Sequence, residues 1–236
     1  MGLRGENLFT ITALPSLGEL GIAPPLTLAE YMEWLGADHP AREAIELLLL
    51  EHDLMQREAL ASGEIDHAEP LVLSEEQMDG TEPLPDFLQG SEDTSRRVAS
   101  DAIWTAYYRH AAHRADTLHA RFLQEYIGFE VALRNQLAEA RAKELGLDVT
   151  PYLVAPELAP FHVDLRATVN EWASAAHPLD GLKVLDRARW NWIEDHDAWF
   201  TFSDDELAAY ATKLTLLIRW ERLNEADDDL LDEAIL

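Results

Sequence analysis

The sequence predicts an all-α protein, an elongated helical bundle built on one long central helix with a short extended segment near the N-terminus. The main observation is the stretch from Thr94 to Leu145, which contains no proline and a single glycine, Gly128. Its apolar residues recur every three or four positions, and the average step matches the period of a straight α-helix. The apolar positions are Trp104, Tyr108, Ala111, Ala115, Leu118, Phe122, Tyr126, Phe129, Leu133, Leu137 and Ala140. A helix of this length would extend for roughly 75 Å at about 1.5 Å per residue, so we expect other helices to pack along it in succession.

The composition limits the classes of function. The chain has 45 acidic and 18 basic residues, for a formal charge of −27. Phosphate binding requires a basic face, so this balance argues against nucleic acid or an anionic membrane as a direct ligand. Two explanations of the acidity stay open: a solvated surface suited to a salty cytoplasm, or a docking surface for a basic partner. There are no cysteines, which excludes disulfides and thiolate chemistry. No apolar run approaches the roughly 18 residues that span a bilayer, so we expect no membrane insertion and a cytoplasmic location.

The first segment, residues 1–62, is expected to hold an arm and a helical hairpin. Asn7 to Leu20 is apolar and partly β-branched up to Pro15, which is typical of a short strand or an extended arm. Thr27 and Glu30 have the spacing of a capping box, so a helix should begin there and end near Gly36. The next helix should begin after residues 38–40 and run to about residue 62.

His52 lies on the apolar face of that second helix. It could be a metal ligand or a core imidazole bonded to a neighbour, and we favour the core role. Residues 63–93 then form an acidic connection without lysine or arginine, in which Ser74 to Gln77 could cap a single helical turn. We interpret it as a solvated linker, with a mobile or partner-binding loop as the alternatives.

Residues 94–236 are expected to form the long helix and a C-terminal bundle, continuous with the N-terminal helices. On the long helix, three oppositely charged pairs spaced four residues apart indicate a solvent-exposed surface. These pairs are Arg121 with Glu125, Glu130 with Arg134, and Glu139 with Lys143. Gly146 should end this helix. Further helices are predicted from Phe161 to Ala176, from Asp180 to Trp199, and from a capping box at Ser203 to Glu206 onward. Arg189 falls within the apolar stripe of its helix, so it needs a carboxylate or carbonyl partner.

No catalytic motif is present in the sequence. There is no phosphate loop, dinucleotide fingerprint, serine elbow or zinc-protease motif, so we predict no catalytic residues, no cofactor and no metal. His110, His113 and His119 are the one local group of histidines, and their helical spacing does not bring all three to one face. Five of the seven tryptophans lie in the C-terminal third. We favour a packed core there, and the alternative is that Trp190 anchors a protein interface.

Three segments of the chain resemble a bacterial family of unknown function. The segments are LFTITALPSL (8–17), FLQEYIGFEVALRNQLAEARAKELGLD (122–148) and LDRARWNWIEDHDAWFTFSDDELAAYATKLTLLIRWERL (185–223). The chain resembles the family in four features. These are an N-terminal segment that ends in Leu-Pro-x-Leu, a Glu-rich helix with Arg-Asn, an Arg-Trp pair, and a last helix with Lys-Leu-x-x-x-x-Arg-Trp. Phe9 stands where the family shows several aromatic residues, so the first segment departs from the pattern. The likeness covers most of the chain except the acidic connection.

The resemblance implies a mechanical role. Genes of this family lie among those for bacterial V/A-type rotary ATPases, and the family stands in the place of the ATPase's C subunit, which is known as d in eukaryotes. The C subunit is a helical socket that joins the rotor shaft of the central stalk to the membrane ring. The implied function is a non-catalytic component that transmits torque, peripheral to the inner membrane through the ATPase complex. The family pattern selects residues for helix packing and for contacts between subunits: Glu130, Arg134, Asn135, Arg189, Trp190, Lys213, Arg219 and Trp220.

Other functions stay open at this point. The chain could be an assembly or regulatory factor of the ATPase, or a generic acidic helical adaptor protein. An enzyme acting on a small molecule is a third class, and it predicts a closed pocket with paired titratable groups whose pKa values are strongly shifted.

Overall fold

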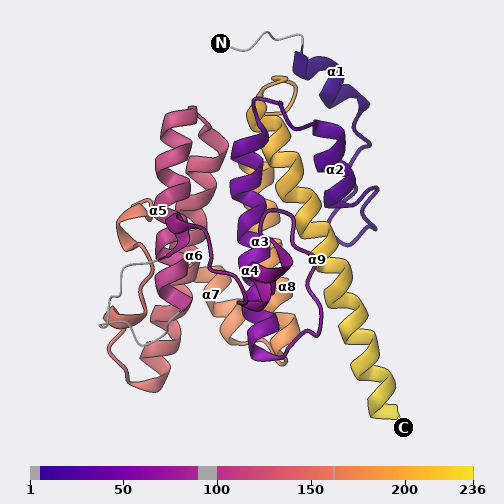
Figure 1. Cartoon of the computed structure of the whole chain (residues 1–236). Helices are drawn as coiled ribbons and strands as arrows, with labels where there is room; N and C mark the ends of the chain where they lie inside the picture. The colour runs from indigo at the N-terminus through magenta and orange to yellow at the C-terminus, as the bar shows by residue number, and fades with distance from the viewer. Residues whose placement is uncertain (1–5, 90–99, 162, 236) are drawn as a thin grey trace. The chain divides into compact units, whose positions relative to one another are not determined.

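The structure of the protein, a computed structural model, describes residues 6–89, 100–161 and 163–235, with the backbone alone described at residue 6 and from residue 227 onward. Over these residues the chain forms nine α-helices, three short 3-10 helices and no β-strand (Figure 1). The all-α prediction is therefore confirmed. The chain divides into two compact units, unit 1 from residues 1–45 and 170–236, and unit 2 from residues 46–169.

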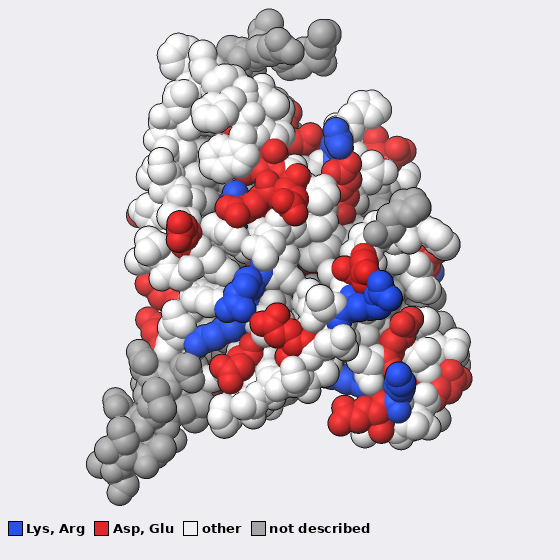
Figure 2. Space-filling view, turned by 180° about the vertical axis from the view of Figure 1, so that it is seen from behind, with Lys and Arg blue, Asp and Glu red and all other residues white. Residues whose placement is uncertain are grey.

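The acidic composition is visible at the surface. On the face drawn in Figure 2, Asp and Glu side chains are spread widely, and Lys and Arg form small separate groups among them. This distribution is the one expected when acids outnumber bases by 45 to 18.

Unit 1 is organised along its last helix. It contains α1 (Glu6–Ala13), α2 (Leu28–Leu35), α8 (Pro178–His196) and α9 (Asp204–Ile235), with the start of α3 (Arg42–Ser62) and the end of α7 (Arg166–Ala173). Helix α8 packs along α9, and α1 and α2 also contact α9. The α9 residues Leu207, Leu214 and Leu217 are buried, as is Ile193 of α8. Tyr31 of α2 is fully buried and donates its hydroxyl to the Leu207 carbonyl at 2.9 Å, which ties α2 to α9.

The predicted strand or extended arm at the N-terminus is wrong in its first part, because Glu6–Ala13 is the helix α1. The β-branched residues there lower helix propensity by only tenths of a kcal/mol each, which tertiary contacts can override. Thr12 satisfies its hydroxyl within the helix by donating to the Leu8 carbonyl at 2.6 Å. Asn7 donates to the Asp204 carboxylate at 2.7 Å, so α1 is also held to the first turn of α9.

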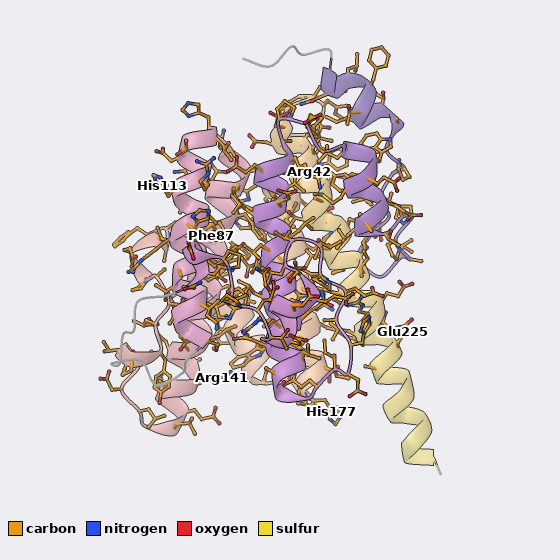
Figure 3. The ribbon with its side chains drawn as sticks, in the orientation of Figure 1. Arg42, Phe87, His113, Arg141, His177 and Glu225 are labelled. Atoms are coloured by element: carbon orange, nitrogen blue, oxygen red, sulfur yellow. The ribbon has the colours of Figure 1, made fainter. Side chains whose placement is uncertain are left out.

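The boundaries of α2 and α3 follow their sequence signals. Thr27 accepts from the Glu30 amide at 3.1 Å while the Glu30 carboxylate accepts from the Thr27 amide at 2.7 Å, which confirms the capping box. Helix α2 ends at Gly36, where φ is +81°. Arg42, labelled at the start of α3 in Figure 3, donates to the Met32 and Gly36 carbonyls at 3.1 Å each. The Gly36 carbonyl thus gains a donor after the end of the helix, and the Met32 carbonyl, which also accepts the Gly36 amide at 3.2 Å, gains a second one.

Unit 2 is organised around a helical hairpin. Its elements are α3 from Glu46 onward, α4 (Glu75–Asp79), η1 (Asp86–Leu88), α5 (Ser100–Leu118), α6 (Arg121–Leu145), η2 (Thr150–Tyr152), η3 (Pro156–Leu158) and the start of α7. Helices α5 and α6 pack on each other. Trp104, Tyr107 and Tyr108 of α5 have ring centroids 5.0–5.9 Å apart and are at most 1% exposed. The Tyr107 hydroxyl donates to the Leu47 carbonyl at 2.8 Å, which joins α5 to α3.

The predicted single long helix is wrong: its described part consists of the two helices α5 and α6, and residues 94–99 lie outside the described residues. The break is at His119, which adopts a left-handed conformation with φ +54°. The Ala120 amide donates to the Ala115 carbonyl at 2.9 Å, and the His119 amide donates to the Asp116 carbonyl at 3.2 Å. This is the Schellman pattern of a helix end. Leu118 and Phe122 keep the spacing of one apolar face across the break, so periodicity alone does not detect it.

Gly128 serves close packing on α6. A Cβ at this position would lie 3.0 Å from Cγ of Pro160 and 3.4 Å from the Leu158 carbonyl oxygen. The absence of a side chain therefore lets the segment after η3 pass directly over the helix.

Part of the acidic connection packs into unit 2. Asp53 of α3 is fully buried and accepts the backbone amides of Leu71, Val72 and Leu73 at 2.7–3.1 Å. Burial raises the pKa of Asp53, and the three amides act in the opposite direction. The capping box at Ser74 is confirmed, since Ser74 and Gln77 exchange side chain to backbone bonds at 3.1 Å and α4 follows. Four apolar side chains of this segment are buried: Ala68, Leu73, Met78 and Leu88.

Candidate functional site

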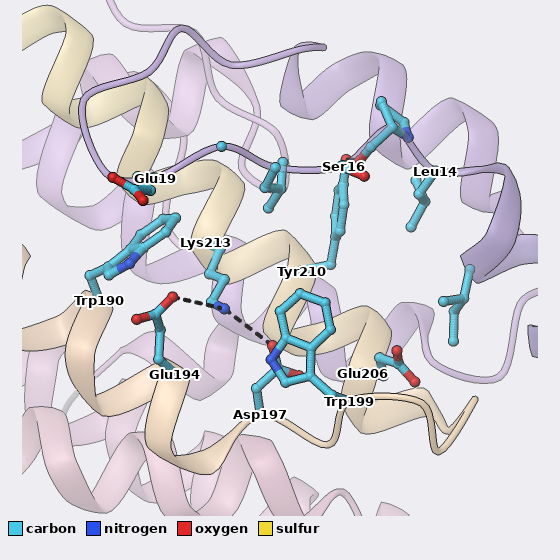
Figure 4. Close-up of a pocket in the computed structure, with 14 residues that line it drawn as sticks. Leu14, Ser16, Glu19, Trp190, Glu194, Asp197, Trp199, Glu206, Tyr210 and Lys213 are labelled. Atoms are coloured by element: carbon cyan, nitrogen blue, oxygen red, sulfur yellow. Dashed lines mark hydrogen bonds and ion pairs between the residues drawn. The ribbon is translucent and has the colours of Figure 1, made fainter.

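A cavity of about 420 Å³ lies within unit 1 (Figure 4). Helix α8 supplies Trp190 and Glu194, and helix α9 supplies Glu206, Tyr210 and Lys213. The turn between these helices supplies Asp197 and Trp199, and residues of the segment 11–19 close another side. The lining thus combines aromatic rings, four carboxylates and one ammonium group.

Lys213 is the centre of the polar side of this cavity. It is 4% exposed, and its Nζ lies 3.3 Å from Asp197 Oδ2 and 3.8 Å from Glu194 Oε1. The same nitrogen lies 4.8 Å from the ring centroid of Trp199 and 5.4 Å from that of Trp190. A buried ammonium needs such partners because its desolvation is costly, and the aromatic faces add an attraction to the cation.

The Asp197 carboxylate has a partner at only one of its two oxygens. Its side chain is 6% exposed, and while Oδ2 pairs with Lys213, Oδ1 is buried without a hydrogen-bond partner. Burial raises the pKa of Asp197, and Lys213 counteracts the effect. The Ala198 amide also lowers this pKa. The carboxylate therefore retains an unused acceptor inside unit 1.

The turn that carries Trp199 has an uncommon backbone. Phe200 and Phe202 have φ values of +60° and +53°, which bulky L-residues rarely adopt. The Glu206 carboxylate accepts the amides of Phe200 at 3.1 Å and Phe202 at 2.8 Å, and so fixes the turn at the start of α9. The capping signal at Ser203 to Glu206 predicts the start of α9 correctly, and Glu206 reaches back to amides upstream of Ser203. Trp199 and Phe200 are 58% and 79% exposed.

The N-terminal segment is attached to the cavity through Tyr210. The Tyr210 hydroxyl donates to the Pro15 carbonyl at 2.9 Å, and burial raises the pKa of Tyr210 to about 12. The phenol therefore keeps its proton at neutral pH and holds residues after α1 against α9.

A second polar cluster in unit 1 joins α8 to α9. Asp186 is fully buried, and its Oδ1 lies 3.1 Å from Arg189 Nη1 and 2.8 Å from Arg219 Nη2. The carboxylate partner that the sequence requires for Arg189 is thus present three residues earlier on the same helix. Trp220 lies nearby in sequence, and a Cβ at Gly21 would be 3.3 Å from its indole nitrogen. Arg187 lies over the Trp220 ring at 5.9 Å.

The remaining residues selected by the family pattern lie on α6 in unit 2. Arg134 pairs with Asp101 at 3.3 Å and lies 4.6 Å from the Trp104 ring centroid. Asn135 exchanges two hydrogen bonds with the backbone of Val154, at 2.8 and 2.9 Å. Glu130 is 2% exposed, so the solvent-exposed role expected for Glu130 and Arg134 is wrong, whereas Arg121 and Glu125 do pair on the surface at 2.8 Å.

The histidines do not gather into a metal site. Within the described residues, no three His, Cys, Asp or Glu side chains come close enough together to hold a metal ion. His110 stacks on Phe87, labelled in Figure 3, with ring centroids 4.1 Å apart. His113 is exposed and His119 occupies the turn between α5 and α6. His52 is 6% exposed on α3. None of the helices described in the chain is both long and apolar enough to traverse a bilayer.

The structure brings together five of the eight family-pattern residues in unit 1 and three in unit 2. Sequence reasoning missed their partners Asp186, Asp197 and Asp101. In a chain with 45 acids, no spacing rule marks out Asp197 or Asp101. Only Asp186 had a usable signal, because it lies three residues before an arginine that needs a carboxylate.

Comparison of the chain with protein-family models, with curated proteins and with solved structures gave no match.

Proposed function

We propose that this chain is a non-catalytic component of a V/A-type rotary ATPase, a socket of the C-subunit kind that couples the rotor shaft to the membrane ring. The proposal starts from the three segments that resemble the ATPase-associated bacterial family. An all-α fold and an acidic surface are compatible with that role. The partners would be the rotor shaft and the proteins of the membrane ring.

One observation carries the proposal furthest. Five of the eight residues that the family pattern selects are buried, and the two basic ones among them, Arg189 and Lys213, lie in ion pairs. These five are Glu130, Asn135, Arg189, Trp190 and Lys213. A pattern taken from sequence likeness alone thus selects buried residues, three of which make polar contacts within their unit. This is what a shared helical scaffold would require, because each buried charge must keep its partner.

The burial also refines the proposal. Buried side chains cannot touch another protein of the complex, so partner contacts must use other residues. Large exposed aromatic side chains are typical of protein interfaces. Unit 1 offers Trp199 and Phe200, and unit 2 offers Phe161, which is 98% exposed.

Co-purification from native membranes tests the proposal. The full chain, tagged at one end, is recovered from detergent-solubilised membranes of its own host, and the associated proteins are identified by mass spectrometry. We expect rotor and membrane-ring proteins in stoichiometric amounts in fractions that hydrolyse ATP. A tagged protein of similar net charge serves as the control for electrostatic adsorption.

The other outcomes are distinct. Recovery with incomplete subassemblies, and loss from the active enzyme, would assign the chain to assembly or regulation. Recovery with unrelated proteins would indicate an acidic adaptor. Absence of every ATPase protein would refute the proposal.

A further inference from the structure

The charge of the cavity in unit 1 is not balanced by its own residues. Glu19, Glu194, Asp197 and Glu206 contribute four carboxylates, and Lys213 is the one basic residue among the described residues that line it. Lys213 is already committed to Asp197 Oδ2 and Glu194. The acids therefore exceed the available cation, and a further positive charge would be attracted to the space.

A specific acceptor is ready for that charge. Asp197 Oδ1 is buried and has no hydrogen-bond partner. The Asp197 side chain as a whole is 94% buried. An unsatisfied buried acceptor is costly, and a donor at the Asp197 carboxylate would reduce this cost. Glu19 is exposed at the rim, so it can contribute charge without first being desolvated.

The rings select the kind of cation. Trp190, Trp199 and Tyr210 present aromatic surface beside the carboxylates, as Figure 4 shows. A guanidinium group is planar, stacks on aromatic faces, donates in a fork to carboxylates, and is more weakly hydrated than an ammonium ion. The volume of about 420 Å³ falls in the range of about 300–1,000 Å³ found for small-molecule sites.

We infer that this cavity is a binding site for a guanidinium group carried on a slender aliphatic chain, with the carboxylates of its lining as acceptors and Trp199 as a stacking surface. The group could belong to a free small molecule or to an arginine side chain of a partner protein. The inference is independent of the proposed ATPase role, since it rests on the chemistry of the cavity alone.

Isothermal titration calorimetry on the full chain tests the inference with two cations. Agmatine represents the free molecule, and the peptide acetyl-Gly-Gly-Arg-Gly-Gly-amide represents a protein side chain. The same peptide with citrulline in place of arginine is the neutral control. We expect saturable binding of a guanidinium probe with one site per chain, weakened by added salt, and no binding of the citrulline peptide. The tighter of the two cations identifies the source.

Paired variants locate the site. Glu19→Gln should weaken binding about threefold, the size expected for a partly exposed charge pair, while Glu221→Gln on the exposed part of α9 should leave it unchanged. Trp199→Leu should weaken binding about three- to fivefold through the lost cation–π contact, while Trp192→Leu, outside the cavity, should not. Asp197→Asn should weaken it about tenfold, with circular dichroism as the check on folding. If Asp197→Asn unfolds, Glu19→Gln and Trp199→Leu provide the test.

Two results would overturn the inference. One is no saturable binding of either cation up to about 10 mM, the affinity that ordinary ligand efficiency gives for a ligand the size of agmatine. The other is equal weakening by Glu19→Gln and Glu221→Gln, which would mean that the net charge of the chain attracts the cation without a defined site.

Discussion

Asp186 shows how a single buried charge holds two helices. It is fully buried on α8, and one of its oxygens accepts from Arg189 of the same helix and from Arg219 of α9. The second oxygen, Oδ2, is buried without a hydrogen-bond partner. Both arginines therefore contact the same carboxylate oxygen, and the loss of Asp186 would remove this shared contact between α8 and α9.

We predict that Asp186→Ala lowers the free energy of unfolding by about 3–5 kcal/mol, because it removes the buried carboxylate that Arg189 and the half-buried Arg219 share. Urea denaturation followed by circular dichroism measures the change. Asp195→Ala, an exposed position on the same helix, is the control and should shift the urea midpoint very little. A loss for Asp186→Ala no larger than that of the control would show that the cluster does not stabilise the packing of α8 on α9.

A surface pair gives a prediction for pH. The Arg166 guanidinium donates to Asp164 at 2.7 and 2.9 Å, and this pair, with the Arg166 amide, lowers the pKa of Asp164 to about 2. An unfolded aspartate titrates near 3.9. The folded pKa is the lower one, so the pair stabilises the fold above about pH 4 and loses that contribution as the pH falls toward 2.

We predict that Arg166→Gln raises the pKa of Asp164 from about 2 toward 3.9, measured from the side-chain carboxyl shift by NMR, and that the backbone amide of residue 166 keeps part of the lowering. Arg187→Gln, an exposed arginine that pairs with Glu171, should leave the Asp164 titration unchanged. High salt should narrow the difference in the Asp164 pKa between the wild-type protein and Arg166→Gln, because both partners of the pair are exposed. A wild-type Asp164 that titrates near 3.9 would contradict the contact.

At the scale of the elements, three helices end in the same Schellman motif, with either glycine or histidine at its left-handed position. Helices α3 and α6 end at Gly63 and Gly146, with positive φ and the same pair of backbone bonds that closes α5. In α5 the left-handed position is held by His119, at φ +54°. Histidine tolerates this conformation better than most L-residues, and glycine adopts it without strain.

We predict that His119→Val destabilises the protein by about 1–3 kcal/mol, because a β-branched residue is strongly disfavoured at positive φ. His119→Gly should be neutral or stabilise by up to about 1 kcal/mol. His113→Val on the exposed surface of α5 is the control and should cost only helix propensity, a few tenths of a kcal/mol. Thermal and urea unfolding of the three variants measure these effects. Equal losses for both valine variants would mean that residue 119 is not strained.

The same comparison explains what the sequence could predict. Short-range signals were sufficient for α2 and α4, whose capping boxes at Thr27 and Ser74 are fixed by residues three apart. The break at His119 was missed because no glycine or proline marks it and the apolar period continues through it. The cavity depends on pairs far apart in sequence, such as Tyr210 with Pro15 and Lys213 with Asp197. Local spacing carries no information about such pairs, so only the need of Arg189 for a carboxylate could be anticipated.

At the scale of the whole molecule, the dominant property is the formal charge of −27. Two like charges 10 Å apart repel by about 0.4 kcal/mol in water, and a compact chain brings many such pairs together. The acids spread over the face in Figure 2 are therefore a source of instability that the buried ion pairs and the apolar cores must offset. Screening by salt acts on the surface pairs and leaves the buried contacts nearly unchanged.

We predict that raising NaCl from about 0.1 to 1 M at pH 7 increases the free energy of unfolding by at least about 1–2 kcal/mol, since the Debye length falls from about 10 to 3 Å and several like-charge pairs are screened. Urea titrations at each salt concentration measure it. The control is the same series near pH 4.5, the isoelectric point, where the net charge vanishes and the salt effect should shrink. Stability that does not change with salt at pH 7 would mean that the acids are spaced widely enough to avoid repulsion. In that case the acidic surface would impose no energetic cost on the isolated chain, and neither a saline cytoplasm nor a basic partner would be needed to relieve it.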